Sequence, residues 1–221
     1  MIKLIAFDWN GTLLADTANS CRASNKVFKI YGLKPISITG FRKTFTIPIK
    51  KMWENNGLNK EIDFLEQSKT FHSIYEEYAV HTRTRQGSKT LLAWLENHRI
   101  KQMIYSNHIA PDIIKQLMRL NIFEYFDEVL ARSAGDHSHT LNKSKEQKLY
   151  DYVKRNKLKP LEVITVGDTE EEIEIGKAAG FYTVAITGGY NTTSRLKKQK
   201  PDFLIHNMLE LKRIIQKLNK I

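Results

Sequence analysis

The sequence predicts an α/β fold, a parallel sheet covered by helices on both faces, with an all-helical insert. Short apolar segments alternate with amphipathic helical segments over most of the chain, and this alternation requires crossover connections between parallel strands. Residues 16–85 differ, because they contain only helical patterns. We therefore expect a core domain formed by residues 1–15 and 86–221 and a helical cap domain formed by residues 16–85.

The strands of the core are predicted from short apolar runs that contain β-branched and aromatic residues. Such runs are typical of strands buried on both faces, as in a parallel sheet. They cover the first half of residues 2–14, then Ile100–Tyr105, Phe126–Leu130, Val163–Val166, Tyr182–Ile186 and Phe203–Ile205.

The helices are predicted from apolar residues at helical spacing and from the residues that stop a helix. Those of the cap are Thr17–Ile30, Ser37–Phe45, Pro48–Asn55 and a long segment from Glu61 to about His81. Those of the core are Gly87–His98, a helix with Pro111 near its first turn, Lys145–Arg155, Glu170–Ala179 and a last helix from about Asn207. We expect a polar loop at residues 131–141 and a solvated basic loop at residues 195–200.

The composition narrows the classes of function. The 221 residues carry a formal net charge of +11 and a single cysteine, Cys21. A lone cysteine forms no internal disulfide and no apolar stretch has the length of a membrane span, so we expect a cytoplasmic protein without membrane contact. The sequence does not fix the oligomeric state, and the expectation is a monomer or a homodimer. The basic residues are spread along the chain without a nucleic-acid-binding motif, so we expect them to attract small anionic substrates and expect no nucleic-acid partner.

Polar residues follow directly on three of the predicted strands. They are Asp8, Ser106 and Asp168. In a parallel sheet, ligands bind outside the carboxyl ends of the strands, and these ends meet at one edge. We therefore expect the three side chains to lie together, although they are far apart in the sequence.

The turn after the first strand is typical of an anion site. Asn10, Gly11 and Thr12 break the strand, and glycine tolerates backbone angles and close approaches that a side chain forbids. A turn of small polar residues leaves amide groups free for an anion. We expect Gly11 and Thr12, together with Asn107 beside Ser106, to contact the substrate.

A pair of carboxylates indicates a metal site. Asp168 ends a strand and Glu172 lies four residues on, across the start of a helix, so the two can offer oxygen ligands to one hard cation. Mg²⁺ suits oxygen ligands and a phosphate partner. We expect Asp8 and Asn10 to complete its ligand set. Glu170 and Glu171 are explained by the helix dipole and are left out of the site.

Three segments resemble motifs of the haloacid dehalogenase superfamily. FDWNGTLL at residues 7–14 resembles its first motif, Asp-x-Asp-Gly-Thr, IYSN at residues 104–107 its second, and GDTEEE at residues 167–172 its fourth. The resemblance implies a Rossmann-like core with an inserted helical cap, and it is nearest to phosphoglycolate-phosphatase-like members.

The same resemblance implies roles for individual residues. Asp8 would be the nucleophile that forms an aspartyl-phosphate, and Ser106 would donate a hydrogen bond to a phosphoryl oxygen. A third-motif lysine would neutralise nucleophile and phosphate; Lys143 fits its position best and Lys145 is second. The implied activity is that of a Mg²⁺-dependent phosphatase acting on a small phosphorylated metabolite.

The cap carries basic residues that can meet a second anionic group of the substrate. They are Arg42, Lys43, Lys50 and Lys51, of which Arg42 is the first to test. Caps of this kind close over a site, exclude water and select the substrate.

Asn10 departs from the family pattern, which has a second aspartate at this place. Asparagine hydrogen-bonds but exchanges no proton at neutral pH, and losing general acid–base help costs about 10²–10⁴-fold in rate. One interpretation is a phosphatase whose substrate has a good leaving group, such as an acyl phosphate or an anhydride, or whose acid comes from elsewhere. A second is a phosphonoacetaldehyde-hydrolase-like C–P hydrolase that uses a cap lysine. A third is a non-catalytic module that binds phosphate or a phosphoprotein, or a protein held as a long-lived aspartyl-phosphate.

Overall fold

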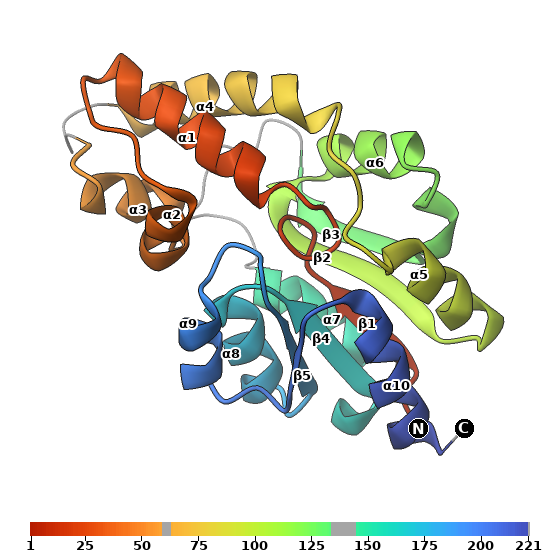
Figure 1. Ribbon diagram of the computed structural model, residues 1–221. Helices are drawn as coiled ribbons and strands as arrows, with labels where there is room; N and C mark the ends of the chain where they lie inside the picture. Colours follow the sequence, from red (N-terminus) through yellow and green to blue (C-terminus); the bar gives the residue numbers. More distant parts are fainter. Residues whose placement is uncertain (59–62, 134–144, 221) are drawn as a thin grey trace.

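A six-stranded parallel sheet forms the centre of the molecule (Figure 1). The computed structural model describes residues 1–58, 63–133 and 145–220. The strand order is β3-β2-β1-β4-β5-β6. Their bounds are β1 Leu4–Phe7, β2 Lys101–Ile109, β3 Glu128–Arg132, β4 Val163–Gly167, β5 Tyr182–Ile186 and β6 Phe203–Ile205. The α/β fold with a parallel sheet is confirmed, and β1 lies between β2 and β4, where the direction of the strand order reverses.

Helices cover this sheet, and four further helices, which follow β1 in the sequence and precede α5, form a separate group. That group, here called the helical insert, consists of α1 Thr17–Ile30, α2 Ile38–Thr44, α3 Ile49–Asn55 and α4 Phe64–Ala79. The core helices are α5 Ser88–Asn97, α6 Ala110–Arg119, α7 Lys145–Arg155, α8 Glu170–Ala178, α9 Thr193–Lys198 and α10 Met208–Asn219, with 3₁₀ turns η1 Phe123–Tyr125 and η2 Pro160–Glu162. No helix among the described residues is both long and apolar enough to cross a bilayer.

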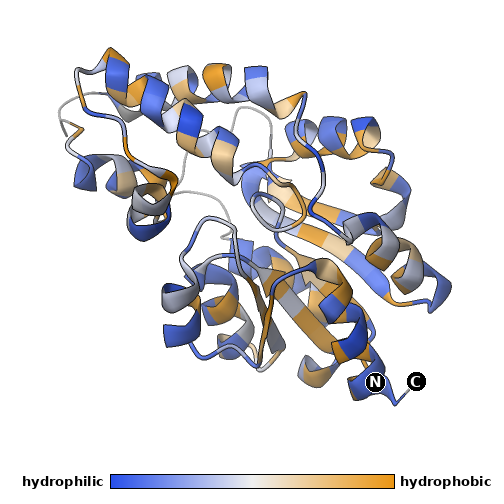
Figure 2. Ribbon diagram, in the orientation of Figure 1, coloured by the Kyte–Doolittle hydropathy of each residue, from blue (hydrophilic) through white to orange (hydrophobic). Residues whose placement is uncertain are grey.

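The alternation of side chains along β1 explains why helices cover both faces of the sheet. Successive side chains of a strand point to opposite faces. Ile5 and Phe7 pack with residues of α5, α6 and α10, whereas Leu4 and Ala6 pack with residues of α7 and α8. In Figure 2, β4 and the middle of β2 are orange, whereas the helices carry both blue and orange residues. Because β1 is covered on both faces, the position of its carboxyl end, which Asp8 follows, is fixed by packing.

The helical insert has an apolar centre of its own. The α1 and α4 helices pack against each other, and Phe28, Phe41, Met52 and Trp53 are buried together. The insert lies beyond the carboxyl end of β1, as the position of α1–α4 in Figure 1 shows. The proposed domain boundaries near residues 15 and 85 stay a prediction. The start of its long helix at Glu61 lies outside the described residues.

Two segments differ from the sequence expectations. The β2 strand continues to Ile109, because its pairing with β3 shifts in register between Tyr105 and Ile109 and the chain stays extended past Ser106. The expected basic loop at residues 195–200 is wrong in its first part, which belongs to α9. Leu196 is fully buried there, and the Thr192 side chain accepts a hydrogen bond from the Arg195 amide, which caps the helix.

The polar loop expected at residues 131–141 is also wrong at its start, because Ala131 and Arg132 belong to β3. Its residues from 134 onward lie outside the described part of the chain.

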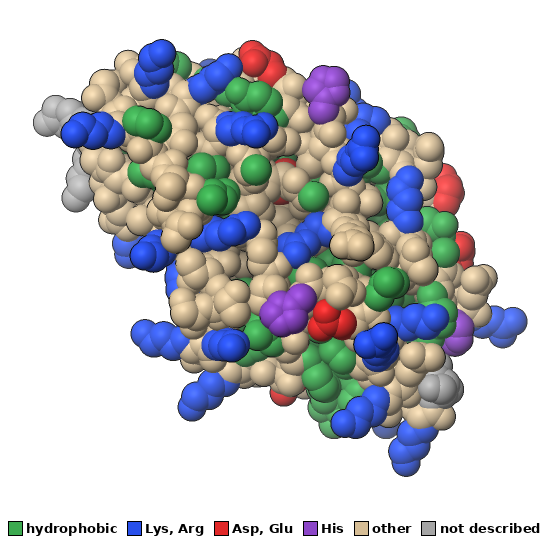
Figure 3. Space-filling model, in the orientation of Figure 1, with side chains coloured by type: hydrophobic (Ala, Val, Ile, Leu, Met, Phe, Trp, Pro, Cys, Tyr) green, Lys and Arg blue, Asp and Glu red, His purple; other side chains and the backbone are tan. Residues whose placement is uncertain are grey.

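The basic side chains are spread over the surface. On the face shown in Figure 3, Lys and Arg side chains occur over both the insert and the core. The described residues on this face therefore form no single basic track of the kind that follows a nucleic-acid backbone.

Candidate active site

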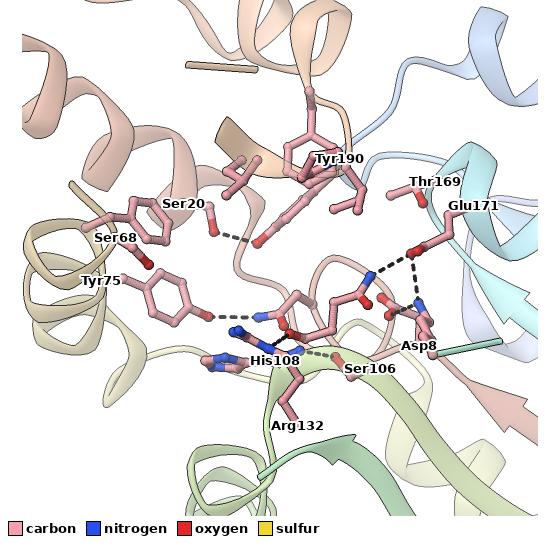
Figure 4. A pocket seen from close by; sticks show the side chains of 18 of the residues that line it. Asp8, Ser20, Ser68, Tyr75, Ser106, His108, Arg132, Thr169, Glu171 and Tyr190 are labelled. Carbon is pink, nitrogen blue, oxygen red and sulfur yellow. Dashed lines mark hydrogen bonds and ion pairs between the residues drawn. The ribbon is translucent and has the colours of Figure 1, made fainter. Parts of the chain in front are cut away.

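A cavity of about 340 Å³ lies between the helical insert and the core. The core side is formed by residues near the carboxyl ends of β1, β2 and β4, among them Asp8, Ser106 and Glu172. The insert side is formed by residues of α1, α2, α3 and α4 and of the segment between α2 and α3. In Figure 4, Asp8 and Glu171 face Tyr75 and Ser20 across this space. The cavity thus joins the two parts of the chain.

Asp8 and Lys145 form the central ion pair of the core side. The Lys145 Nζ donates a hydrogen bond of 2.7 Å to Asp8 Oδ1 and another to Glu172 Oε1. Lys145 begins α7, and its side chain is only 2% exposed. Although burial opposes its charge, the Asp8 and Glu172 carboxylates hold the pKa of Lys145 well above its usual value. The structure therefore brings Lys145 to the position for which Lys143 was preferred, while Lys143 lies outside the described residues.

The carboxylates beside this lysine outnumber it. Burial raises the pKa of Asp8 well above its usual value; Lys145 opposes the shift, and Glu172 and Asp168 add to it. Burial, followed by repulsion from Glu172, raises the pKa of Asp168 to about 7. Three buried carboxylates, Asp8, Asp168 and Glu172, thus lie together on the core side, and such a concentration of negative charge favours a bound cation.

Asp168 is held against the turn that follows β1. Thr12 Oγ1 donates to Asp168 Oδ1 at 2.7 Å, and the Tyr190 amide donates to Oδ2. Gly11 has a φ of +75°, and a Cβ at this position would lie 2.2 Å from Asp168 Oδ2. Glycine is thus required here both by the backbone angle and by the close approach of the carboxylate.

Glu172 has both of its carboxylate oxygens engaged. Oε1 accepts from Lys145, and Oε2 accepts from the amide and the hydroxyl of Thr169 at 3.1 and 2.6 Å. The second contact is a capping box at the start of α8. The structure therefore gives Glu172 an anchoring role besides the metal-ligand role expected from the sequence.

The donor chemistry of the site fits a hard divalent cation. Asp8 and Asp168 offer carboxylate oxygens, the donor type that Mg²⁺ prefers. The ligand atoms of the predicted carboxylate ligands nevertheless do not all lie within 4.8 Å of one another. Among the described residues, the group of three metal-binding side chains with ligand atoms all within 4.8 Å of one another is Glu76, His108 and Asp112, at a different place. Asp8 and Asp168 are the residues that would hold the cation.

The Asn10 amide is fixed by a buried carboxylate that the sequence analysis missed. Asn10 Nδ2 donates to Asp16 Oδ2 at 2.7 Å and to the Tyr75 hydroxyl at 3.1 Å. Asp16 also accepts from the Tyr75 hydroxyl at 2.6 Å, from the Tyr190 hydroxyl at 2.8 Å and from the Gly11 amide at 2.7 Å. Burial raises the pKa of Asp16, and these hydrogen bonds lower it. The network orients the Asn10 side chain with its nitrogen toward Asp16, which leaves its oxygen as the acceptor on the other branch.

The second predicted motif lies at the cavity as expected. Ser106 and Asn107 both line it, and the Ser106 hydroxyl accepts from the His108 amide at 3.2 Å. Asn107 Nδ2 donates to Glu171 Oε2 at 2.8 Å. Glu171 was assigned to the helix dipole alone, but its side chain lines the cavity near Lys145. Because Glu171 and Glu172 are adjacent on one helix, the sequence does not show which of them faces the site. The orientation of α8 in the structure determines this.

Other predicted contact residues lie outside the cavity. The Gly11 amide donates to Asp16 and is not free for an anion, and Thr12 is fully buried with its hydroxyl on Asp168. Arg42 donates to the backbone carbonyls of Gly188 and Gly189 at 2.8 and 2.9 Å. These three residues therefore support the site from behind, and neither Thr12 nor Arg42 lines the cavity.

Several residues of the site have no sequence signal that identifies them. Tyr75 and Tyr190 reach the cavity from α4 and from the segment after β5, and His108 and Arg132 come from β2 and β3. A helical pattern explained Tyr75 as a packing residue. Asp16 lies two residues beyond the first-motif segment, where the insert begins. Its place as a carboxylate so close to the first motif is the one sequence signal that could have identified it as a site residue.

A family model for haloacid dehalogenase-like hydrolases matches residues 5–186. The chain belongs to this family. A phosphoglycolate phosphatase of Photobacterium profundum is 26% identical over 95% of this chain and 94% of its own length, and one of Photorhabdus laumondii is 27% identical over 95% and 91%. The family assignment predicted from the three motifs is confirmed.

Solved structures show the same fold. A haloacid dehalogenase-like family hydrolase from Streptococcus pneumoniae superposes with a TM-score of 0.83 at 21% identity, covering 97% of this chain and 99% of that one. A β-phosphoglucomutase from Clostridium difficile superposes with a TM-score of 0.74 at 19% identity, covering 100% and 98%. At these identities the likeness establishes the fold and leaves the reaction to the site.

Proposed function

We propose that the protein is a metal-dependent phosphatase that transfers the phosphoryl group of a small phosphorylated metabolite to Asp8. The observation that carries the proposal is the hydrogen bond of 2.7 Å from Lys145 Nζ to Asp8 Oδ1 at the bottom of the cavity. A carboxylate nucleophile needs its charge screened from the phosphate, and Lys145 supplies that screening. The curated relatives that match nearly the whole chain carry the name phosphoglycolate phosphatase, which supports the same class of reaction.

The residues of the core side have separate roles in this reaction. An oxygen of Asp8 attacks phosphorus, the bond from phosphorus to the ester oxygen breaks with its electron pair going to that oxygen, and the leaving oxygen takes its proton from solvent. The Ser106 hydroxyl, which lines the cavity, donates to a phosphoryl oxygen, and Lys145 neutralises the charge that gathers on the phosphoryl group. Water then hydrolyses the aspartyl-phosphate to phosphate and free Asp8.

A divalent cation such as Mg²⁺, held by Asp8 and Asp168, would lower the repulsion between the carboxylate and the phosphate. Asn10 sets the limit of the reaction. Its amide neither donates nor takes up a proton at neutral pH, so the leaving oxygen departs as an anion or receives its proton from solvent. The proposed compartment is the cytoplasm, because the single cysteine suits a reducing environment.

The experiment is hydrolysis of an activated phosphate ester with and without Mg²⁺, followed by intact mass measurement after rapid acid quenching. We expect turnover that stops on chelation by EDTA and an adduct with the mass of one phosphoryl group. An absence of both turnover and adduct over a panel of phosphate esters would favour the binding-module interpretation.

The C–P hydrolase interpretation finds no support in the cavity. It requires an imine-forming lysine from the cap, and the described lysines that line the cavity, Lys145 and Lys148, both belong to α7 of the core.

A further inference from the structure

The insert side of the cavity is largely aromatic, and the polar residues Ser20, Ser24, Ser68 and His72 lie beside its rings. Phe41, Phe45, Ile49, Trp53 and Phe71 line it, with Tyr75 next to the network of Asp16. The rings contact one another: the centroids of Trp53 and Phe71 are 5.6 Å apart, and Phe71 stacks on Tyr75 at 5.9 Å. Together these residues, here called the aromatic wall, form a surface that favours a flat apolar group of a ligand.

Positive charge is confined to the opposite side. Within the described residues, the Lys and Arg side chains that line the cavity are Arg132, Lys145 and Lys148, and all three come from the core. Lys148 donates to the Ala131 carbonyl and Arg132 to the Asn107 carbonyl. An anionic group directed toward the insert would therefore face the aromatic wall, and burying an unpaired carboxylate against apolar side chains is strongly unfavourable.

The size of the cavity points in the same direction. About 340 Å³ is within the range of sites that enclose organic ligands larger than a phosphate ion. Phe45 and Tyr190 meet edge to face with centroids 4.6 Å apart, and both are buried, so this end of the cavity is formed by packed rings. The space beyond the phosphoryl site is therefore shaped for a ring.

Asn10 supplies an independent argument from chemistry. Without a general acid, the ester oxygen leaves readily only when its conjugate acid is acidic. A phenol, with a pKa of about 10, is a far better leaving group than an aliphatic alcohol, whose pKa is close to the value of about 15.7 for water. The hydrogen bond of 2.7 Å from Asn10 Nδ2 to Asp16 Oδ2 holds the amide away from any proton-donating role.

We infer that the substrate is a small aryl phosphate, a phosphate ester of an uncharged phenol whose ring lies on the aromatic wall. This inference rests on the proposed phosphatase function and names its substrate class. Asp8 forms the bond to phosphorus, the bond to the phenolic oxygen breaks with its electron pair, and the phenolate takes a proton from solvent. Water then releases phosphate from Asp8, so aryl phosphate and water give phenol and phosphate.

The kinetic experiment compares three substrates that separate ring binding from leaving-group chemistry. Phenyl phosphate has the ring and a phenol leaving group, benzyl phosphate has the ring and an alkoxide leaving group, and phosphoglycolate has neither but carries a carboxylate. We expect the two ring substrates to share a KM at least tenfold below that of phosphoglycolate. We expect kcat for phenyl phosphate to exceed kcat for benzyl phosphate by about 10²-fold or more, the range of a missing general acid.

The variant experiment uses two aromatic residues of one helix. Phe71 and Tyr78 both belong to α4 and are partly buried, but only Phe71 lines the cavity. Phe71→Ala should raise KM for both ring substrates about tenfold and leave KM for phosphoglycolate within twofold. Tyr78→Ala is the matched control and should leave all three values within twofold.

A binding measurement keeps the inference separate from the reaction. By calorimetry in the presence of Mg²⁺, phenylphosphonate should bind at least tenfold more tightly than phosphonoacetate, and Phe71→Ala should remove this preference. Preferred turnover of phosphoglycolate, or tighter binding of phosphonoacetate, would overturn the inference and leave the phosphatase function standing. Preferred binding of phenylphosphonate without turnover of any ester would support the ring site and contradict the proposed function.

Discussion

The two sides of the cavity are built on opposite principles. On the core side, the buried charged groups Asp8, Lys145 and Glu172 are joined by direct hydrogen bonds, and each is placed by the end of a strand or the start of a helix. On the insert side, residues such as Phe45 and Trp53 present rings that contact other rings. The core side thus fixes the geometry of a reaction, and the insert side offers a surface whose main demand on a ligand is shape and low polarity.

The difference teaches where sequence changes act in this molecule. A buried ion pair depends on exact partners, because removing one leaves the other charge uncompensated. An apolar surface tolerates exchange among side chains of similar volume. Single substitutions on the core side should therefore reduce activity or stability strongly. Single substitutions on the insert side should change substrate affinity by smaller amounts.

The largest expected effect is at Asp8. Asp8→Asn keeps the size of the side chain and an oxygen for Lys145, but it removes the nucleophile. We expect the turnover of phenyl phosphate to fall by about 10⁴–10⁶-fold and the phosphoryl adduct to vanish from the mass spectrum. Circular dichroism should show an unchanged fold, and a variant that retains more than a tenth of the activity would exclude Asp8 as the nucleophile.

The next effect is on stability, at Lys145. Lys145→Met leaves Asp8 and Glu172 as buried carboxylates without their cation, which should lower the free energy of unfolding by about 3–5 kcal/mol. The measurement is urea denaturation at pH 7.5. Lys154→Met, at an exposed position of the same helix, should change it by less than about 0.5 kcal/mol.

Lys143→Met in the same series compares the two lysines considered for the third motif. A loss of stability from this variant as large as that from Lys145→Met would contradict the assignment to Lys145.

A gain of activity is expected at Asn10. In Asn10→Asp, a partly buried carboxyl group lies beside the buried Asp16, and repulsion between two carboxylates this close keeps a proton on the pair. That proton serves the leaving oxygen, and the turnover of benzyl phosphate should rise about 10²-fold, with a much smaller rise for phenyl phosphate. Asp16→Asn alone adds no acid and should raise neither rate. An equal response of both substrates would show that the leaving group does not limit the reaction.

The smallest effect concerns pH and His108. Burial lowers the pKa of His108 to about 3, with His72 and Arg132 adding to the shift. The unfolded chain therefore binds a proton near pH 6.5 that the folded chain binds only near pH 3. The stability linked to this group is fully present above pH 6.5 and falls as the pH decreases toward 3.

His108→Gln should remove this part of the pH dependence. Between pH 7.5 and pH 5 the wild-type protein should lose about 1–2 kcal/mol more stability than the variant, as measured by urea denaturation at each pH. Parallel losses in the two proteins would show that the pKa of His108 is not lowered in the folded chain.

The sequence predicted the core side better than the insert side for a physical reason. Apolar strands in a parallel sheet bring their carboxyl ends to one edge, so Asp8, Ser106 and Asp168 could be placed together from their positions alone. The predicted partner of Asp8, Lys143, lies two residues before the observed one, Lys145, because spacing in a polar segment does not show which lysine starts the helix. The aromatic wall could not be predicted, since Phe71 and Trp53 have the spacing of ordinary packing residues and only the docking of four helices opens a cavity beside them.

Two arginines that donate in opposite directions connect α2 and Phe45, which follows it, with the core. Arg42 of the insert donates to the Gly188 and Gly189 carbonyls, and Arg195 of the core donates to the Phe45 carbonyl at 2.6 Å. Every one of these acceptors is main chain, which any residue type presents. These hydrogen bonds between insert and core therefore do not depend on the side chains of the accepting residues. Substitutions at the accepting positions can change the lining of the cavity while the bonds that connect insert and core are kept.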